Sequence, residues 1–143
     1  MKQKFVDLYM DWAKRSSQLS HARRLKVGAV IVKDDTVISY GYNGMPAGWD
    51  NDCENIVGYT NNEPVYKTKP EVLHAESNAI AKLAKSNNSG LGATIFVTHS
   101  PCMECAKLIA QSGISSVFYS ENYRDDSGLT FLKNSGIIVE QIK

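Results

Sequence analysis

Apolar residues recur at helical spacing in three stretches of the chain. In residues 3–18 they recur at intervals of three and four, which predicts an amphipathic helix packed on a core. The residues of that stripe are Phe5, Leu8, Tyr9, Trp12 and Ala13. Residues 73–84 predict a second helix, and the Asn, Ser and Gly residues of 87–92 end it. Residues 102–112 predict a third, with Pro101 directly before it.

Short apolar runs rich in β-branched residues predict strands around these helices. The predicted strands cover residues 27–32, 37–42, 93–99, 114–120 and 136–142. A polar turn joins the first two into a hairpin, and a short helix at 128–134 joins the last two. A helical connection favours parallel pairing of the strands that it links. We therefore expect an α/β fold: a mixed five-stranded sheet with helices on both faces and its last two strands parallel.

Residues 49–70 follow neither pattern. They are polar and contain Asn61, Asn62, Pro64 and Pro70, so we expect a long irregular loop. Long ordered loops in compact domains often serve as lids or binding loops. Cys53 lies within this segment without further metal-ligand candidates nearby, so we expect a free thiol.

Composition narrows the classes of protein to consider. The 143 residues are 43% hydrophobic and 22% charged, which predicts one globular domain over residues 1–143. The net charge of +1 gives no general polyanion-binding surface, so we expect no nucleic-acid partner. No apolar run could span a bilayer or serve as a signal peptide, so we expect no membrane partner. An odd number of cysteines, two of them in C-x-x-C, predicts a reducing cytoplasm, the host's for a viral protein.

The chemistry concentrates in two short motifs at predicted helix starts. His74 with Cys102 and Cys105 makes a set of three ligands that zinc favours, which leaves a fourth position for water. Glu76, two residues past the histidine, can lie beside that water and move its proton without being a ligand. The helix dipole favours both the carboxylate and the thiolates at these positions. His99 precedes the second motif, and we expect it to be buried or near the pocket rather than a ligand.

The order of these residues is the known H-x-E…P-C-x-x-C signature of the zinc nucleoside and nucleobase deaminases. Further stretches resemble the deoxycytidylate (dCMP) deaminase family over nearly the whole chain. They read Lys-Val-Gly-Ala-Val-Ile at 26–31, Gly-Tyr-Asn-Gly-Met-Pro at 41–46, His-Ala-Glu-Ser-Asn-Ala-Ile at 74–80 and Ser-Pro-Cys-Met-Glu-Cys-Ala-Lys at 100–107. The resemblance implies a three-layer, cytidine-deaminase-like fold.

The resemblance also implies a reaction and its residues. The family hydrolyses dCMP to dUMP and ammonia, which feeds dTMP synthesis. One catalytic Zn²⁺ per subunit would be held by His74, Cys102 and Cys105, with Glu76 as the proton shuttle. The implied substrate-binding residues are Asn43, Ala75, Arg24, Lys26, Ser100 and Tyr123. Among them Arg24, Lys26 and Tyr123 are candidates for the 5′-phosphate, and Tyr123 and Arg124 follow a strand end, a usual place for ligand contacts.

From the residues alone, plainer interpretations stay open. Asn43 can be a turn residue, Tyr123 a half-exposed loop aromatic, and the basic cluster around Arg24 a solvated loop. The runner-up enzymes are a tRNA adenosine deaminase and a free cytosine or cytidine deaminase. A purely structural zinc in a regulatory module would need a fourth ligand, such as Cys53, His99, His21 or a carboxylate.

The family is also associated with regulation and assembly. The resemblance implies a homo-oligomer, a hexamer, that is activated by dCTP and inhibited by dTTP, with Mg²⁺ accompanying the effector. The effector site would include Gly44, Ala47 and Gly48.

Overall fold

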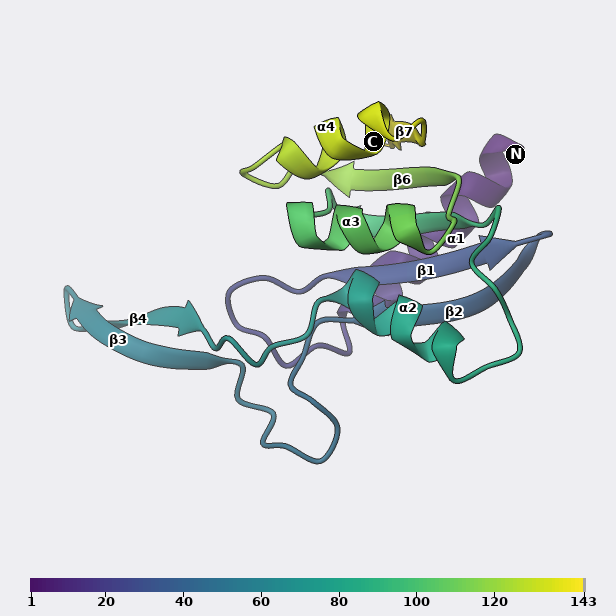
Figure 1. Ribbon diagram of the computed structural model, residues 1–143. Helices are drawn as coiled ribbons and strands as arrows, with labels where there is room; N and C mark the ends of the chain where they lie inside the picture. The colour runs from purple at the N-terminus through teal and green to yellow at the C-terminus, as the bar shows by residue number, and fades with distance from the viewer. Residues whose placement is uncertain (143) are drawn as a thin grey trace.

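The computed structural model describes residues 1–142 as an α/β fold around a five-stranded mixed sheet (Figure 1). The strands are β1 (Gly28–Lys33), β2 (Thr36–Tyr42), β5 (Thr94–His99), β6 (Ser116–Glu121) and β7 (Ile138–Gln141). Their order in the sheet is β2-β1-β5-β6-β7. Strand β1 pairs antiparallel with β2 and β5, whereas β5–β6 and β6–β7 are parallel. The predicted mixed sheet with parallel last strands is confirmed; Lys143, the last residue of the predicted domain, lies outside the described residues.

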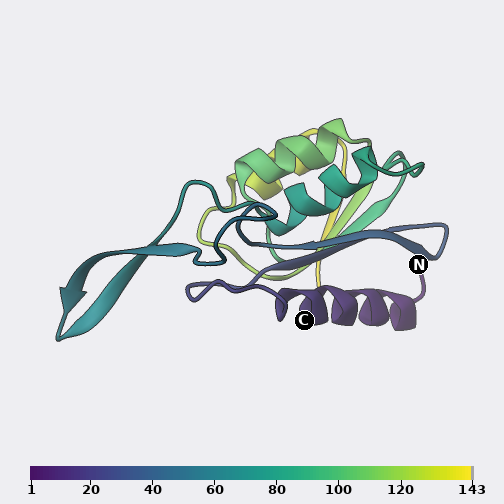
Figure 2. The same cartoon turned by 90° about the horizontal axis from the view of Figure 1, so that it is seen from below.

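Helices cover both faces of this sheet, as predicted (Figure 2). Helix α1 (Gln3–Ser17) lies on one face, and α2 (Ala75–Ala84), α3 (Met103–Gln111) and α4 (Ser127–Asn134) lie on the other. Across residues 1–142, every helix is too short or too polar to cross a lipid bilayer.

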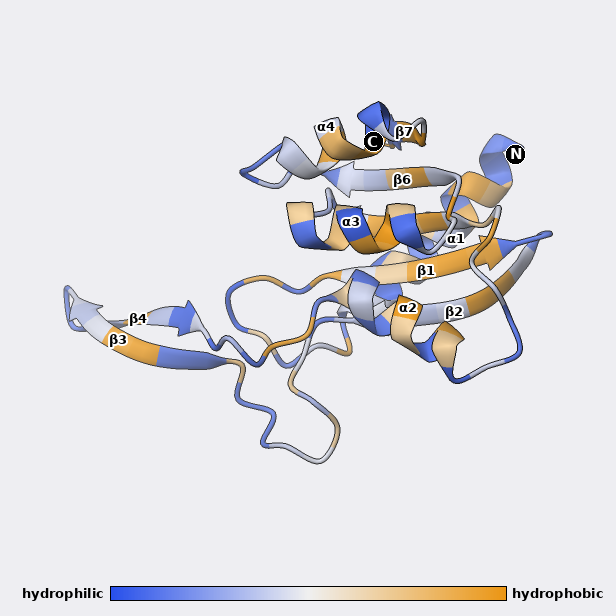
Figure 3. Ribbon diagram, viewed as in Figure 1, coloured by the Kyte–Doolittle hydropathy of each residue, from blue (hydrophilic) through white to orange (hydrophobic). Residues whose placement is uncertain are grey.

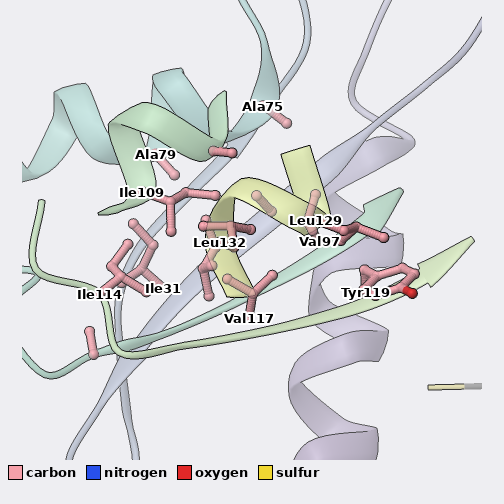
Figure 4. Close-up of a cluster of buried hydrophobic side chains, with 14 of the residues drawn as sticks. Ile31, Ala75, Ala79, Val97, Ile109, Ile114, Val117, Tyr119, Leu129 and Leu132 are labelled. Atoms are coloured by element: carbon pink, nitrogen blue, oxygen red, sulfur yellow. The ribbon is translucent and has the colours of Figure 1, made fainter. Parts of the chain in front are cut away.

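The central strands are apolar on both faces because each face is covered by helices. Successive strand residues point to opposite faces, so Val30 packs under α1 while Ile31 packs under α2–α4. Figure 3 shows the resulting continuous apolar run along β1, and Figure 4 shows the larger of the two clusters. On the α1 side, the Phe96 ring stacks on Phe118 at 5.0 Å and meets Tyr9 at 5.5 Å between centroids.

Helix α1 is confirmed, but its buried face is rotated from the expected one. Leu8 and Trp12 are 46% and 48% exposed, and the buried apolar residues are Val6, Tyr9, Met10 and Ala13. Both stripes have helical spacing, so the sequence pattern does not separate them. Ala13 belongs to both stripes, and its backbone lies so close to Gly28 in β1 that any Cβ there would overlap the Ala13 carbonyl.

The expectation of an irregular loop over residues 49–70 is wrong. This segment contains β3 (Glu54–Thr60) and β4 (Glu63–Thr68), an antiparallel hairpin that extends from the body as an arm (Figures 1 and 2). Asn61 and Asn62 form its two-residue turn with φ of 52° and 64°, the backbone of a type I′ turn, in which Asn is well tolerated. The register shifts between Ile56 and Gly58, so the regular alternation that marks a strand in sequence is interrupted.

Candidate active site

The structure brings the three predicted metal ligands together at the starts of two helices. His74 is the N-cap of α2 and Cys102 the N-cap of α3, one residue outside each helix, and Cys105 lies in the first turn of α3. The His74 Nδ1 atom lies 3.3 Å from Cys105 Sγ and 3.6 Å from Cys102 Sγ. All three ligand atoms lie within 4.8 Å of one another.

This donor set fits a zinc ion. Tetrahedral Zn²⁺ with ordinary Zn–N and Zn–S lengths separates its nitrogen and sulfur ligands by about 3.5–3.8 Å, and the distances from His74 to the two thiols are close to that range. Within residues 1–142 this is the one group of three or more His, Cys, Asp or Glu side chains near enough to share an ion. Neither Cys53 nor His99 joins it, so in the described chain no fourth protein ligand supports the structural-zinc alternative.

The electrostatics of the site favour a cation. Hydrogen bonds from the Cys105 thiol and from His74 lower the pKa of Cys102 to about 4. The same bond to Cys102, together with burial, raises the pKa of Cys105. The Cys102 thiolate in turn raises the pKa of His74. The Cys102 ligand is therefore already a thiolate at neutral pH, as a cysteine that binds a metal must be.

Glu76 lies in the first turn of α2, next to these ligands but outside their group. Its side chain is buried, and burial raises the pKa of its carboxyl to about 7. A carboxyl that titrates near neutral pH can both accept and return a proton, which is what general acid–base catalysis requires.

His74, Glu76 and Cys102 line a pocket of about 770 Å³, whereas Cys105 is buried and is not part of its lining. Most of the predicted substrate-binding residues line it, namely Arg24, Asn43, Ala75, Ser100 and Tyr123. Lys26 is exposed and does not line the pocket, so the structure does not bring it to the others. His99 and Cys53 also line the pocket. Burial lowers the pKa of His99, whose Nδ1 lies 2.9 Å from Thr98 Oγ1, and raises the pKa of the Cys53 thiol.

Asn43 can be both a turn residue and a substrate-binding residue, the two roles that its sequence context leaves open. Its Oδ1 accepts a hydrogen bond from Val27 N at 2.9 Å, and its Nδ2 donates to Leu25 O at 2.8 Å. The amide thus fixes the backbone of the pocket wall. An amide has a second N–H and a second oxygen lone pair, so a ligand contact stays chemically available.

Ser100 positions the opposite wall. Its buried Oγ accepts a hydrogen bond from Tyr123 N at 2.6 Å, which holds the segment after β6 against the pocket. Arg124 follows and also lines the pocket, with its guanidinium 6.0 Å from the Tyr123 ring centroid. Arg124 is not among the substrate-binding residues expected from sequence, although its place after a strand end was a usable signal.

The three effector-site candidates lie outside the pocket lining. Gly44 forms an antiparallel bridge with Leu73, the residue before His74, through hydrogen bonds of 3.1 and 2.8 Å. Ala47 and Gly48 are exposed, and Gly48 has a φ of 85°.

Comparisons with known proteins agree with this geometry. A family model described as "Cytidine and deoxycytidylate deaminase zinc-binding region" matches residues 2–121. The deoxycytidylate deaminase of Enterobacteria phage T2 is 40% identical over 159 residues, covering 86% of this chain and 84% of the phage protein. The human deoxycytidylate deaminase is 38% identical over 134 residues, covering 87% and 73%.

A solved structure extends the match to nearly every described residue. The crystal structure of dCMP deaminase from the cyanophage S-TIM5, in complex with dCMP and dUMP, has a TM-score of 0.88 and 40% identity, with 99% of each chain covered. The predicted cytidine-deaminase-like fold and the family resemblance are confirmed.

Proposed function

Because the chain belongs to the cytidine and deoxycytidylate deaminase family, we propose that it converts dCMP and water to dUMP and ammonia. A member of this family is a hydrolytic deaminase. We propose its substrate and the roles of its residues. The observation that carries it is a buried carboxyl, Glu76, beside a three-ligand group in a pocket that arginines also line. The cyanophage relative was crystallised with dCMP and dUMP, which supports the same substrate here.

His74, Cys102 and Cys105 would hold one Zn²⁺ per subunit, since one imidazole and two thiols suit that ion. When bound with an open position, zinc acts as a Lewis acid that lowers the pKa of water from 15.7 to about 7. The chain's own contribution is the fixed geometry of the two helix starts and the ready ionisation of Cys102.

Glu76 would carry the protons of the reaction. It would take a proton from the attacking water and pass it to the ring nitrogen beside C4 of cytosine. It would then move the proton of the new C4 hydroxyl to the amino group, which leaves as ammonia while the C4 carbonyl of dUMP forms. Burial raises the pKa of its carboxyl to about 7, so it can both accept and return a proton near neutral pH. A backbone group of Ala75 and the free hydrogen-bonding capacity of Asn43 would orient the base and the sugar.

Arg24 and Arg124 would bind the 5′-phosphate. They come from distant parts of the chain, yet both line the pocket, and guanidinium groups make charge-assisted hydrogen bonds to phosphate. The net charge is only +1, so these local cations rather than a general field would select the phosphate. Free cytidine and cytosine carry no phosphate, so an enzyme that deaminates them would not need these arginines.

The steady-state constants for dCMP and deoxycytidine test this assignment. We expect Arg24→Ala and Arg124→Ala each to raise the KM for dCMP about tenfold or more, with little change for deoxycytidine. Lys26→Ala is the matched control, because it removes an exposed cation of the same segment outside the pocket. Equal effects on both substrates would refute the phosphate contact.

The resemblance to the family further predicts a homohexamer, activation by dCTP and inhibition by dTTP with Mg²⁺, and supply of dUMP to dTMP synthesis. Gly44, Ala47 and Gly48 stay the candidate effector residues. Sedimentation velocity and initial rates with each triphosphate would test these predictions, and a monomer insensitive to both would contradict them.

A further inference from the structure

A buried carboxylate lies where the hairpin arm joins the body. The Glu54 side chain, at the first residue of β3, is 0% exposed. Its Oε2 accepts hydrogen bonds from the backbone N–H groups of Arg23 at 2.8 Å and Arg24 at 3.1 Å. Its Oε1 lies 3.4 Å from Arg23 Nη1. A buried charge is costly unless it is paired and hydrogen-bonded, so these three contacts account for its presence there.

The two arginines anchored by this carboxylate have different side-chain partners. The Arg23 guanidinium donates to Asp52 Oδ1 at 2.7 Å and lies 5.2 Å from the Tyr66 ring centroid, so it faces the hairpin. Arg24 lines the pocket, with its Nη1 3.5 Å from Thr68 Oγ1. Arg23 and Arg24 lie in a bend of the chain, and both of their amide N–H groups point at the same carboxylate oxygen, so the backbone from which each side chain leaves is fixed. Fixing both amides therefore determines which guanidinium reaches the pocket.

We propose that Glu54 is a positioning residue for the substrate phosphate: it holds the amides of Arg23 and Arg24 so that the Arg24 guanidinium stays at the pocket. This inference rests on the proposed function, in which Arg24 meets the 5′-phosphate. Glu54 also lines the pocket, but a carboxylate has no direct attraction for phosphate. Its carboxylate also occupies two backbone N–H groups that would otherwise be an anion site of their own.

The role of Glu54 has a kinetic signature that a purely structural role lacks. When the anchor is removed, the backbone at Arg23 and Arg24 is released, and ordering the Arg24 side chain again on binding costs conformational entropy. The loss falls on binding of a phosphorylated substrate. It leaves untouched both the chemistry at Glu76 and the handling of a substrate without phosphate.

A double-mutant cycle tests the inference. We expect Glu54→Ala to raise the KM for dCMP about tenfold, with kcat and the constants for deoxycytidine within about twofold of wild type. In an Arg24→Ala background, Glu54→Ala should change the KM for dCMP no further, because coupled residues are non-additive. Glu54→Gln should give an intermediate KM, since its amide oxygen still accepts a hydrogen bond. Glu63→Ala, an exposed glutamate of the same hairpin, is the matched control and should change nothing.

The outcomes distinguish failure of the proposed function from failure of the positioning role of Glu54. If wild type fails to convert dCMP, the proposed function fails. If wild type converts dCMP but Glu54→Ala leaves its KM unchanged, affects deoxycytidine equally, or adds fully to Arg24→Ala, the positioning role is overturned. If Glu54→Ala fails to fold, as judged by its thermal transition, the same cycle is run with Glu54→Gln and decides by the same criteria.

Discussion

Gly41 in β2 is the point at which helix α2 lies directly on the sheet. A Cβ at Gly41 would overlap the carbonyl oxygen of Ala75 and lie 2.7 Å from Ala79 N, both in the α2 backbone. Ordinary contact begins at 3.4 Å, so Gly41→Ala should push the first turn of α2 away by about 0.7 Å or more. His74 and Glu76 are carried by that turn, so a metal ligand and the proton shuttle would move with it.

The expected losses of zinc affinity, activity and stability in Gly41→Ala are large for the addition of one methyl group. Metal sites hold their ligand distances to within about 0.2 Å, and displacements on the order of 1 Å can cost a hundredfold in rate. Overpacking a rigid contact costs about 1–3 kcal/mol of stability. We therefore expect Gly41→Ala to bind zinc at least about tenfold more weakly, to lose about a hundredfold in kcat when loaded, and to unfold at a lower temperature.

Zinc competition with a chromophoric chelator, initial rates and thermal unfolding measure these three effects. Gly44→Ala is the matched control, assayed without effectors: its Cβ would meet nothing within 4 Å, and its φ is not in the left-handed region. If Gly41→Ala matches Gly44→Ala in zinc affinity and kcat, the close approach of α2 to β2 does not position the site.

Three further changes test the roles of individual site residues. Cys102→Ser should lose zinc and activity together, and metal analysis that finds full occupancy would contradict ligation. Glu76→Ala should keep zinc but lose about 10²–10⁴ in kcat, so unchanged turnover would refute the proton shuttle. In the zinc-free protein, burial raises the pKa of Glu76 from 4.5 to about 7, so the stability tied to its neutral form is complete below pH 4.5 and lost as the pH rises through about 7. Urea titrations at several pH values give the free energy of unfolding of zinc-free wild type and of zinc-free Glu76→Gln. The wild-type value, relative to that of the variant, should fall between pH 4.5 and about 7. A difference that does not change with pH would contradict the raised pKa of Glu76.

The sheet and the metal ligands could be predicted from sequence because their signals are local and strong. Strand β1 is buried on both faces and reads as an unbroken apolar run. His74, Cys102 and Cys105 are specified by spacing and residue type, and the helix starts that carry them follow from ordinary boundary signals.

The remaining features depend on contacts between distant residues. The buried face of α1 packs on Val30, Val32 and Phe96, which lie in other elements. The hairpin has no clear sequence signal, because its register shift at Val57 interrupts the alternation and because it leaves Tyr59 68% exposed, unlike a core strand. Arg24 and Lys26 are alike in sequence terms, but in the structure Arg24 lines the pocket, with its backbone N–H on Glu54, and Lys26 does not line it.

Conversion of dCMP to dUMP is the most direct test of the central claim. The purified protein, loaded with one zinc ion per chain, is mixed separately with dCMP, dCTP, deoxycytidine and cytosine, with and without dCTP or dTTP as effector, and the ultraviolet change of deamination is followed. The account predicts turnover of dCMP with a kcat/KM far above that of deoxycytidine or cytosine, and none after zinc is removed. Absence of dCMP turnover by the loaded protein, with dCTP present, would contradict it.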